Sequence, residues 1–272
     1  MIYHYTDLNA AISIAKKGEV WLTDYRFLND KEEFITGYEV LLEALDEYQD
    51  SEKKYPHGFT EDITRALEFI RGESFQQLER NNIFVASFSH VPDLLGQWRN
   101  YGKYCLELDS DFFRSEDVEV LDCHYLHHHG DALGYANALI NTQILPNLLD
   151  VWRKDKCLIS VELSCLLDIY ALSFKHQAFN DESEVRFVFG CPSDDKRISF
   201  RARDDILIPY ISVSFDRQLL KCITVGPLNN QSLALDSLSM FAESISREVQ
   251  AELGSLDYVL AVNNSDIPYR DI

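Results

Sequence analysis

The sequence predicts an α+β fold with mixed or antiparallel sheets and flanking helices, in a single domain spanning residues 1–272. Two observations lead to this prediction. Segments with strand alternation and segments with helical spacing come in uneven clusters, whereas a doubly wound parallel sheet needs the two to alternate regularly. In addition, no repeat, low-complexity tract or Gly/Ser-rich linker divides the chain.

The expected elements follow in chain order. Residues 2–6 alternate like a strand, and Asp7 can cap a helix that Gly18 closes. The apolar face expected for this helix is Leu8, Ala11, Ile12 and Ala15. Up to residue 125 we then expect strand 19–23, a helix after a polar turn at 29–30, a loop at 49–60, helix 61–78, strand 83–89, a short helical stretch holding Trp98 and Tyr101, strand 104–108 and strand 118–125.

The second half repeats this mixture. Two helices are expected at 132–153 and 158–174, separated by the charged residues RKDK. The later elements are expected to be strands 185–189, 197–201, 206–214 and 221–225, helix 233–253 and strand 258–262.

The charge balance limits the partners. The chain has 45 Asp and Glu against 25 Lys and Arg, a formal net charge of −20, while 46% hydrophobic residues are typical of a packed globule. Broad nucleic-acid binding is therefore not expected, because a surface that grips a duplex needs clustered Lys and Arg. A local basic groove stays possible.

The cysteines and the lengths of the apolar runs indicate where in the cell the protein is expected. Six cysteines lie singly in apolar runs with no CxxC pair, which indicates buried free thiols in a reducing environment. The first 20 residues lack the pattern of a signal peptide, and nowhere do 18 apolar residues run together. We expect a soluble, cytoplasmic protein with no membrane partner.

Two predicted strands carry candidate ligand-binding groups. A histidine flanked by two tyrosines lies on the first strand, where alternation puts His4 on one face and Tyr5 on the other. Ser87 and Ser89 share a face of strand 83–89, and such small hydroxyl residues leave room for a flat ligand. Both patterns also occur in ordinary sheets, where His4 would be a hydrogen-bonded core histidine.

A polar loop ends in the most suggestive group of charges. Glu182, Glu184 and Arg186 alternate at the entrance of strand 185–189, so two carboxylates and a guanidinium should be collinear on one face. Crowding of this kind can raise the pKa of one carboxyl group, unless Arg186 or a ligand compensates the repulsion. At a solvated edge the same pattern would have no functional meaning.

Two further segments were weighed as sites. In QWRNYG, Trp98 is expected to pack in the core, and Tyr101 is the better candidate for contacting a ligand. The run Cys123–His129 holds one cysteine and four histidines, but no second Cys/His pair stands at zinc spacing, so a polar turn and no metal site is expected. Dinucleotide-binding, P-loop, hydrolase-elbow and zincin motifs are absent from the sequence.

The ordered blocks YHYT, LNDKEEF, ASFS, QWRNYG, KHQAFNDESEVRF, ITVGP and SDIPYR, from residue 2 to residue 270, resemble a bacterial domain family of unknown function that is often encoded in defence-associated loci. Members usually carry extra residues and a second glycine after the WxxY block, where Tyr101-Gly102-Lys103-Tyr104 runs straight on. That departure puts a ligand role for this loop in doubt.

The chain is also distantly similar to the ADP-ribosyltransferase superfamily. Those folds begin with a strand bearing a His or Arg of the catalytic site, use a central strand with serine or tyrosine, and end with a glutamate, frequently in an ExE pair. His4, Ser87 with Ser89, and Glu182-Ser183-Glu184 occur here in that order.

The similarity implies an enzyme that takes NAD as its substrate. Glu184 would hydrogen-bond the nicotinamide ribose and stabilise the developing cation, Glu182 would orient or deprotonate the acceptor, and His4 would hold the adenosine ribose. A tyrosine would stack on nicotinamide and an arginine would meet the diphosphate. The residues expected to contact NAD are thus Tyr5, Ser87, Ser89, Tyr101, Arg186 and Arg270.

Three functional hypotheses stay open. The first is the NAD-using transferase, acting as a toxin or effector in bacterial anti-phage defence, with a macromolecular acceptor or a cognate regulator protein as partner. The second is a catalytically inert interaction or sensor module that binds a basic protein. The third is a metal-dependent nuclease with a divalent ion between the carboxylates of Asp30, Glu33, Glu182 and Glu184.

Overall fold

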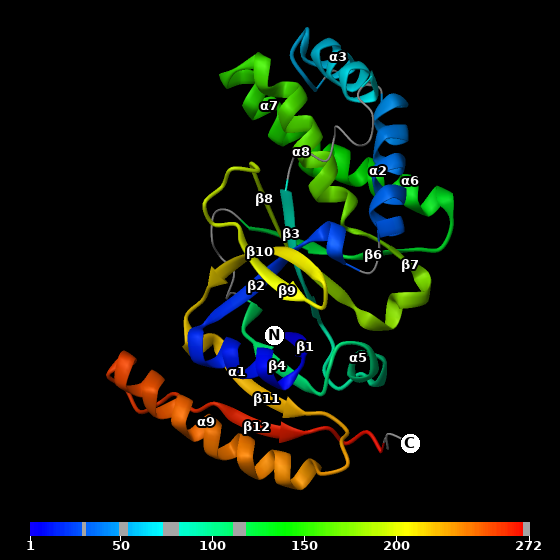
Figure 1. Ribbon diagram of the computed structural model, residues 1–272. Coiled ribbons are helices and arrows are strands. Elements are labelled where there is room, and N and C mark those ends of the chain that lie inside the picture. Colours follow the sequence, from blue (N-terminus) through cyan, green and yellow to red (C-terminus); the bar gives the residue numbers. More distant parts are fainter. Residues whose placement is uncertain (29–30, 49–53, 73–81, 111–117, 269–272) are drawn as a thin grey trace.

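A large sheet lies at the centre of the molecule, with a group of helices at one end and a long helix at the other (Figure 1). The computed structural model describes residues 1–28, 31–48, 54–72, 82–110 and 118–268. The predicted fold class is confirmed, because the chain forms a mixed sheet flanked by helices in a single domain. Asp30 and Arg270, and the predicted polar turn at 29–30, lie outside the described residues.

Within those ranges the strands are β1 (Ile2–Thr6), β2 (Glu19–Asp24), β3 (Asn82–Ser89), β4 (Tyr104–Leu108), β5 (Glu119–Asp122), β6 (His124–Leu126), β7 (Phe174–His176), β8 (Glu184–Cys191), β9 (Ser199–Arg203), β10 (Ile206–Ser214), β11 (Leu220–Val225) and β12 (Ala261–Asn264). The helices are α1 (Leu8–Lys17), α2 (Lys31–Asp46), α3 (Phe59–Gly72), α5 (Leu95–Asn100), α6 (His129–Leu139), α7 (Leu145–Lys154), α8 (Ile159–Ala171) and α9 (Gln231–Leu253). Short 3-10 turns include η5 (Gln177–Glu182).

Local rules account for α1, which connects β1 to β2. The Asp7 carboxylate accepts a hydrogen bond of 2.9 Å from the amide of Ala10, and Gly18 ends the helix at φ 63°. The buried face differs from the predicted one. It consists of Ala11, Ile14 and Ala15, while Leu8 is exposed. The helix is therefore rotated about its own axis by a fraction of a turn relative to the expected orientation.

Several further elements differ from the prediction. The helix expected at 158–174 ends at Ala171, and Phe174 begins the strand β7. Residues 118–125 form two strands, because the ladder with β8 ends at Asp122 and β6 pairs with β7 instead. The helix expected at 132–153 is interrupted by a π-helical turn at Ile140–Ile144. The final strand, β12, begins three residues later than expected, at Ala261. Residues 49–53 of the expected loop and 73–78 of the expected third helix lie outside the described ranges.

The sheet branches at β3, and this branching positions the site. The main strand order is β12-β11-β4-β1-β3-β2-β10-β9, and β8 pairs with the other edge of β3 over its full length. On the shared edge, β2 pairs with Phe84 and Val85, whereas β1 pairs with Ser89. Between these two contacts, residues 86–88 have no strand partner on that edge within the described chain. The strands β1 and β2 thus diverge and leave a gap beside β3.

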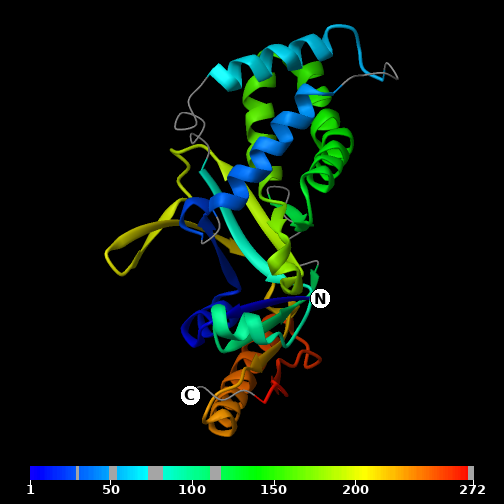
Figure 2. The same cartoon turned by 90° about the vertical axis from the view of Figure 1, so that its right-hand side faces the viewer.

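Two apolar clusters lie on opposite faces of the shared strands. Val85 and Val188 pack under α2, α3, α6, α7 and α8, while their neighbours Phe84 and Phe187 pack toward α1 and α9. Figure 2 shows the two groups of helices at opposite ends of the molecule, with the β9–β10 hairpin projecting sideways between them. A smaller cluster joins Tyr5 to Trp98 and Cys105.

The six cysteines differ in their burial. All six cysteines are free, and four of them are buried, whereas Cys165 is half-buried and Cys157 is exposed in the 3-10 turn Lys156–Leu158 before α8. The prediction of uniformly buried thiols is therefore wrong at Cys157.

None of the helices found in the described ranges combines the length and the apolar composition needed to cross a membrane.

Candidate functional site

A cleft of about 500 Å³ opens beside β3, where β1 and β2 diverge from each other. Its volume is typical of a small-molecule site. Six predicted site residues from distant parts of the sequence line it: His4, Tyr5, Ser87, Tyr101, Glu182 and Glu184. The structure therefore brings together the N-terminal histidine, the central serine and the late acidic pair, as the similarity to transferases led us to expect.

The His4 ring bridges the gap between β1 and β3. Its Nδ1 lies 3.0 Å from the backbone carbonyl oxygen of Ser87, and a carbonyl can only accept, so Nδ1 carries the proton. Burial lowers the pKa of His4 against the opposing effect of this hydrogen bond. At neutral pH the ring is therefore neutral, and Nε2 is an acceptor.

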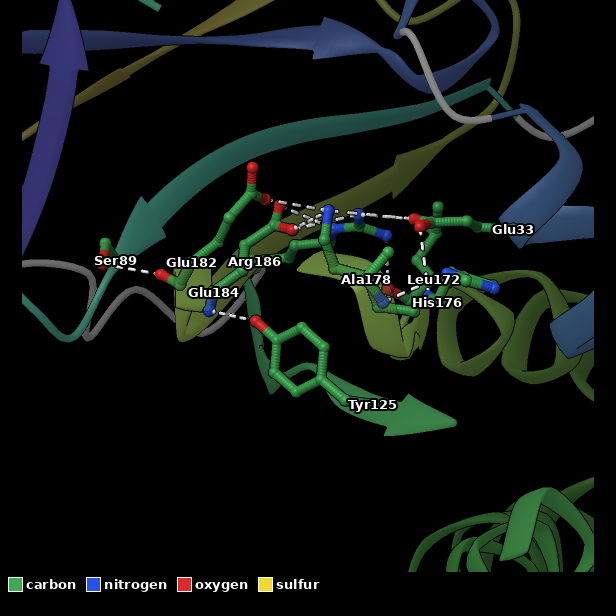
Figure 3. A network of polar contacts seen from close by, with 10 residues as sticks. Glu33, Ser89, Tyr125, Leu172, His176, Ala178, Glu182, Glu184 and Arg186 are labelled. Atoms are coloured by element: carbon green, nitrogen blue, oxygen red, sulfur yellow. Dashed lines mark hydrogen bonds and ion pairs between the residues drawn. The ribbon is translucent and has the colours of Figure 1, made fainter. Parts of the chain in front are cut away.

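Glu184 is the centre of a buried charge cluster. Its carboxylate accepts a hydrogen bond of 2.8 Å from Arg186 Nε, and the ammonium of Lys175 lies 2.7 Å from its other oxygen. The side chain of Glu184 is 7% exposed, and that of Lys175 only 1%. Figure 3 shows the carboxylates of Glu184 and Glu33 reaching Arg186 from β8 and α2. Both cations are thus held between carboxylates.

Two further carboxylates complete this cluster. The ammonium of Lys175 lies 3.2 Å from Glu182 and 3.9 Å from Glu33, and Arg186 Nη2 lies 3.3 Å from Glu33. Three carboxylates and two cations give a formal charge of 2 − 3, or −1. The cluster therefore presents one net negative charge beside the cleft.

Of the two outcomes that the sequence left open for Glu184, compensation by Arg186 is found, and the pKa of this carboxyl group is not raised. Burial alone would raise the pKa of Glu184, but Arg186 and Lys175 outweigh it and lower that pKa to about 2. The same contacts raise the pKa of Lys175, although its burial works in the opposite direction. The carboxylate of Glu184 consequently stays ionised at any physiological pH.

Strand alternation is not what places Glu182 beside Glu184, so that part of the prediction is wrong. Glu182 ends η5 before β8 begins, and the intervening Ser183 has a left-handed φ of 42°. The two carboxylates meet through Lys175 instead. Sequence reasoning missed this lysine, and the available signal was a single lysine directly after the apolar run that ends in Phe174.

Three of the predicted ligand contacts are engaged elsewhere. Tyr5 lines the cleft, but its phenol oxygen accepts a hydrogen bond of 3.0 Å from the amide of Leu94, and its ring packs edge-on against Trp98. The Ser89 hydroxyl is buried and donates to the carbonyl of Glu182 at 2.7 Å.

Arg186 also needs correction as a diphosphate ligand. Besides its contacts with Glu184 and Glu33, it donates from Nη1 to the carbonyl oxygen of Leu172 at 2.8 Å, and its side chain is 5% exposed. A buried guanidinium with these acceptors already in place is not presented to a ligand in the cleft. The other expected arginine, Arg270, lies outside the described residues.

The residues around Tyr101 behave as expected. Trp98 is fully buried and donates from Nε1 to Asp93 at 2.8 Å, whereas Tyr101 is 43% exposed. Tyr101 lines both the main cleft and a recess of about 80 Å³ that continues toward Lys175 and Arg186. Tyr101 is thus a partly exposed lining residue of both hollows.

Sequence reasoning missed two residues of the opposite wall, Trp21 on β2 and Arg201 on β9. The guanidinium carbon of Arg201 lies 5.4 Å from the centre of the Trp21 ring, and Nη2 donates to Thr23 Oγ1 at 2.9 Å. These residues come together because β10 pairs with both β2 and β9. No local pattern in the sequence indicates that register.

The geometry gives no support to the metal hypotheses within the described residues. The ammonium of Lys175 lies between the carboxylates of Glu33, Glu182 and Glu184, where the nuclease hypothesis needs a divalent ion. In the histidine run, His128 caps α6 and His129 contacts Glu43. The described chain contains no group of three or more His, Cys, Asp or Glu side chains arranged to hold a metal.

Comparison with family models, with curated proteins and with solved structures finds no match to this chain. The geometry of the cleft is therefore the basis for assigning a function.

Proposed function

We propose that this protein is an ADP-ribosyltransferase-like enzyme that takes NAD as its substrate. The observation that supports the proposal is the convergence of His4, Ser87 and Glu184 on one cleft at the branch of the sheet. An inert module gives no reason for three such residues, separated by most of the chain, to line the same ligand-sized hollow.

The charge cluster suits the transition state of this reaction. Cleavage of the nicotinamide–ribose bond passes through an oxocarbenium-like cation, as glycoside cleavage does. The net negative charge beside the cleft would stabilise that cation, and the fixed contacts of Glu184 mean that little reorganisation is needed. The oxygen of Glu184 that accepts from Arg186 Nε keeps a second lone pair, which can accept from a ribose hydroxyl.

Glu182 is placed to handle the acceptor. Its side chain is 13% exposed, about twice the value for Glu184, and it lines the cleft. In the transfer step the bond from ribose C1′ to nicotinamide breaks, and nicotinamide leaves with the electron pair. The acceptor forms the new bond to C1′, and its proton passes to the carboxylate of Glu182. With water as acceptor the product is ADP-ribose.

The remaining contacts follow from the same placement. Nε2 of neutral His4 would accept from a hydroxyl of the adenosine ribose, and the exposed ring of Tyr101 would stack on nicotinamide. In a bacterial cell we propose that the enzyme acts as a toxin or effector in anti-phage defence, modifying a macromolecular acceptor.

The test is NAD consumption by the purified chain, with and without a bacterial lysate as the source of acceptor. We expect nicotinamide release, and Glu182→Gln should slow it by at least about a hundredfold, because it removes the proton acceptor. Glu243→Gln, an exposed carboxylate of α9 paired only across one helical turn, is the matched control and should keep full activity. Melting temperatures of the variants establish that each is folded.

Two results would overturn this proposal. One is the absence of nicotinamide release under every condition tested. The other is equal activity of Glu182→Gln and Glu243→Gln, which would make the acidic pair irrelevant to the reaction.

A second candidate is favoured by one observation. The cations of the cluster are fully compensated by buried carboxylates, as in a structural ion-pair network. In that case the chain is an inert interaction module whose acidic surface binds a basic protein. Growth arrest on expression of the wild-type chain, and its loss in Glu182→Gln, would favour the enzyme over the module.

A further inference from the structure

Arg201 is the single arginine or lysine among the described residues that line the cleft. It reaches there from the projecting β9–β10 hairpin, with its guanidinium carbon 5.4 Å from the Trp21 ring and 6.0 Å from the Tyr210 ring. Register explains this grouping, because Tyr210 pairs with Thr23 and Arg201 pairs with Ile208 on the next strand. The side chains of Trp21, Thr23, Arg201, Ile208 and Tyr210 therefore stand on one face of the sheet.

The donors of Arg201 are only partly used. Nη2 donates to Thr23 Oγ1 at 2.9 Å, but Nε is buried without any hydrogen-bond partner. No carboxylate in the described part of the chain forms an ion pair with this guanidinium. Burial and the nearby charge of Arg203 lower the pKa of Arg201, as expected for a cation without a compensating anion.

Two carboxylates that line the same cleft, those of Asp7 and Glu19, form hydrogen bonds with other partners. The charge of Asp7 acts on Arg201, but its carboxylate caps α1 through the amide of Ala10. Glu19 accepts from the hydroxyl of Ser212 at 3.0 Å. A cation that is fixed in place in a ligand-sized cleft, and that forms no ion pair with a described carboxylate, is a site for an anionic group of the ligand.

The cleft is also polarised along β3. The Thr23 partner of Arg201 pairs with Val85, whereas Glu184 pairs with Ser89 on the opposite edge of the same strand. Four residues of strand separate these positions by roughly 13 Å, at about 3.3 Å per residue. Glu182 and Glu184 repel anions at one end of the cleft, and Arg201 supplies a guanidinium at the other end, where Asp7 and Glu19 also line the wall.

We propose that Arg201 and Trp21 form a phosphate subsite, and that the cleft takes a nucleotide with its phosphate at Arg201 and a ribose at the acidic pair. The planar guanidinium matches a phosphate group, and the Trp21 indole offers a flat wall to the neighbouring ring or sugar. The orientation of the ribose rests on the proposed function, whereas the phosphate subsite rests on Arg201 itself.

Calorimetric titration with ADP and with adenosine tests the subsite. ADP should bind the wild-type chain, and Arg201→Gln should weaken its binding by about tenfold or more, through loss of a charge-assisted hydrogen bond. Arg203→Gln is the matched control, since it removes the same charge from an exposed position two residues along β9. It should change the affinity for ADP less than about twofold, and adenosine should bind all three proteins alike.

The failures of the two proposals can be told apart. The subsite is wrong if ADP does not bind the wild-type chain, or if Arg201→Gln and Arg203→Gln lower the affinity for ADP equally. It is also wrong if Arg201→Gln lowers the affinity for adenosine as much as the affinity for ADP. Arg201-dependent ADP binding without NAD cleavage would overturn the transferase and keep the subsite. NAD cleavage with an unchanged KM in Arg201→Gln would overturn the subsite and keep the transferase. Arg201→Lys, which keeps the charge but not the planar fork, should lie between the wild type and Arg201→Gln.

Discussion

Each charged residue of the buried cluster depends on its neighbours for its ionisation. Lys175 is 1% exposed, and such an ammonium is tolerated because Glu184, Glu182 and Glu33 surround it. Glu184 in turn stays ionised because two cations contact it. The cluster is therefore a cooperative unit, and removing one member leaves the others buried without compensation.

The pH dependence of stability should report Glu184. Its pKa is about 2 in the folded chain against an ordinary value of 4.5, so its contribution is fully present above about pH 5 and is lost as the pH falls toward 2. The expected contribution is about 3 kcal/mol. Urea unfolding of the wild type and Glu184→Gln should differ most near pH 6 and converge near pH 2. A difference that stays constant over this range would contradict the assignment.

Residue types predicted the members of the site better than their roles. The ExE pattern located Glu182 and Glu184, and the YHY pattern located His4. The role expected for Arg186 was wrong, because no pattern could show that Leu172 and Glu33 would supply its acceptors. A sequence gives the distance along the chain between charged groups, but their compensation depends on distances in space.

At the scale of elements, the turn from α5 to β4 holds the end of β1 in place. Gly102 lies there at φ 146°, and a Cβ atom at this position would stand 2.1 Å from the carbonyl oxygen of Thr6. The close approach brings Tyr101 to the wall of the cleft beside β1. Glycine is needed for both the backbone conformation and the space.

Gly102→Ala should therefore lower the free energy of unfolding by about 1–3 kcal/mol, through backbone strain and displacement of β1. Gly134→Ala in α6 is the control, because a Cβ atom there meets nothing within 4 Å. That substitution should raise stability by up to about 1 kcal/mol, as alanine favours a helix. Chemical denaturation measures both, and equal effects of the two substitutions would contradict this account of the turn.

Elements with local end signals were predictable from the sequence, and elements that depend on pairing were not. The Asp7 cap and Gly18 predicted both ends of α1. The strand expected at 118–125 divides at Cys123, because Glu119–Asp122 pairs with β8 and the next residues pair with β7. The branch at β3 has no counterpart in local composition, since it arises from which strands reach one edge.

At the scale of the whole molecule, the two main apolar clusters share the same two strands. Val85 and Val188 belong to one cluster, and Phe84 and Phe187 belong to the other. Because β3 and β8 carry both sets on alternate residues, neither cluster can lose its packing without disturbing the other. A division of the chain into independently folding parts would have to break this ladder.

The chain should consequently unfold in one cooperative transition. Leu167→Ala in the first cluster and Leu106→Ala in the second remove fully buried side chains, and each should cost about 2–5 kcal/mol. Both variants should shift a single transition, seen alike by far-UV and near-UV circular dichroism. Two separate transitions in either variant would contradict the prediction of one domain.

The permanent ionisation of Glu184 has a consequence for how the rate would vary with acidity. Since Glu184 titrates near pH 2 and the pKa of Lys175 is raised, neither group changes its charge across the neutral range. The electrostatic field that these two groups apply to a bound molecule is then the same at mildly acidic pH as at neutral pH. If the rate changes with pH between about 5 and 9, the titrating group is then the acceptor or a side chain other than Glu184 and Lys175.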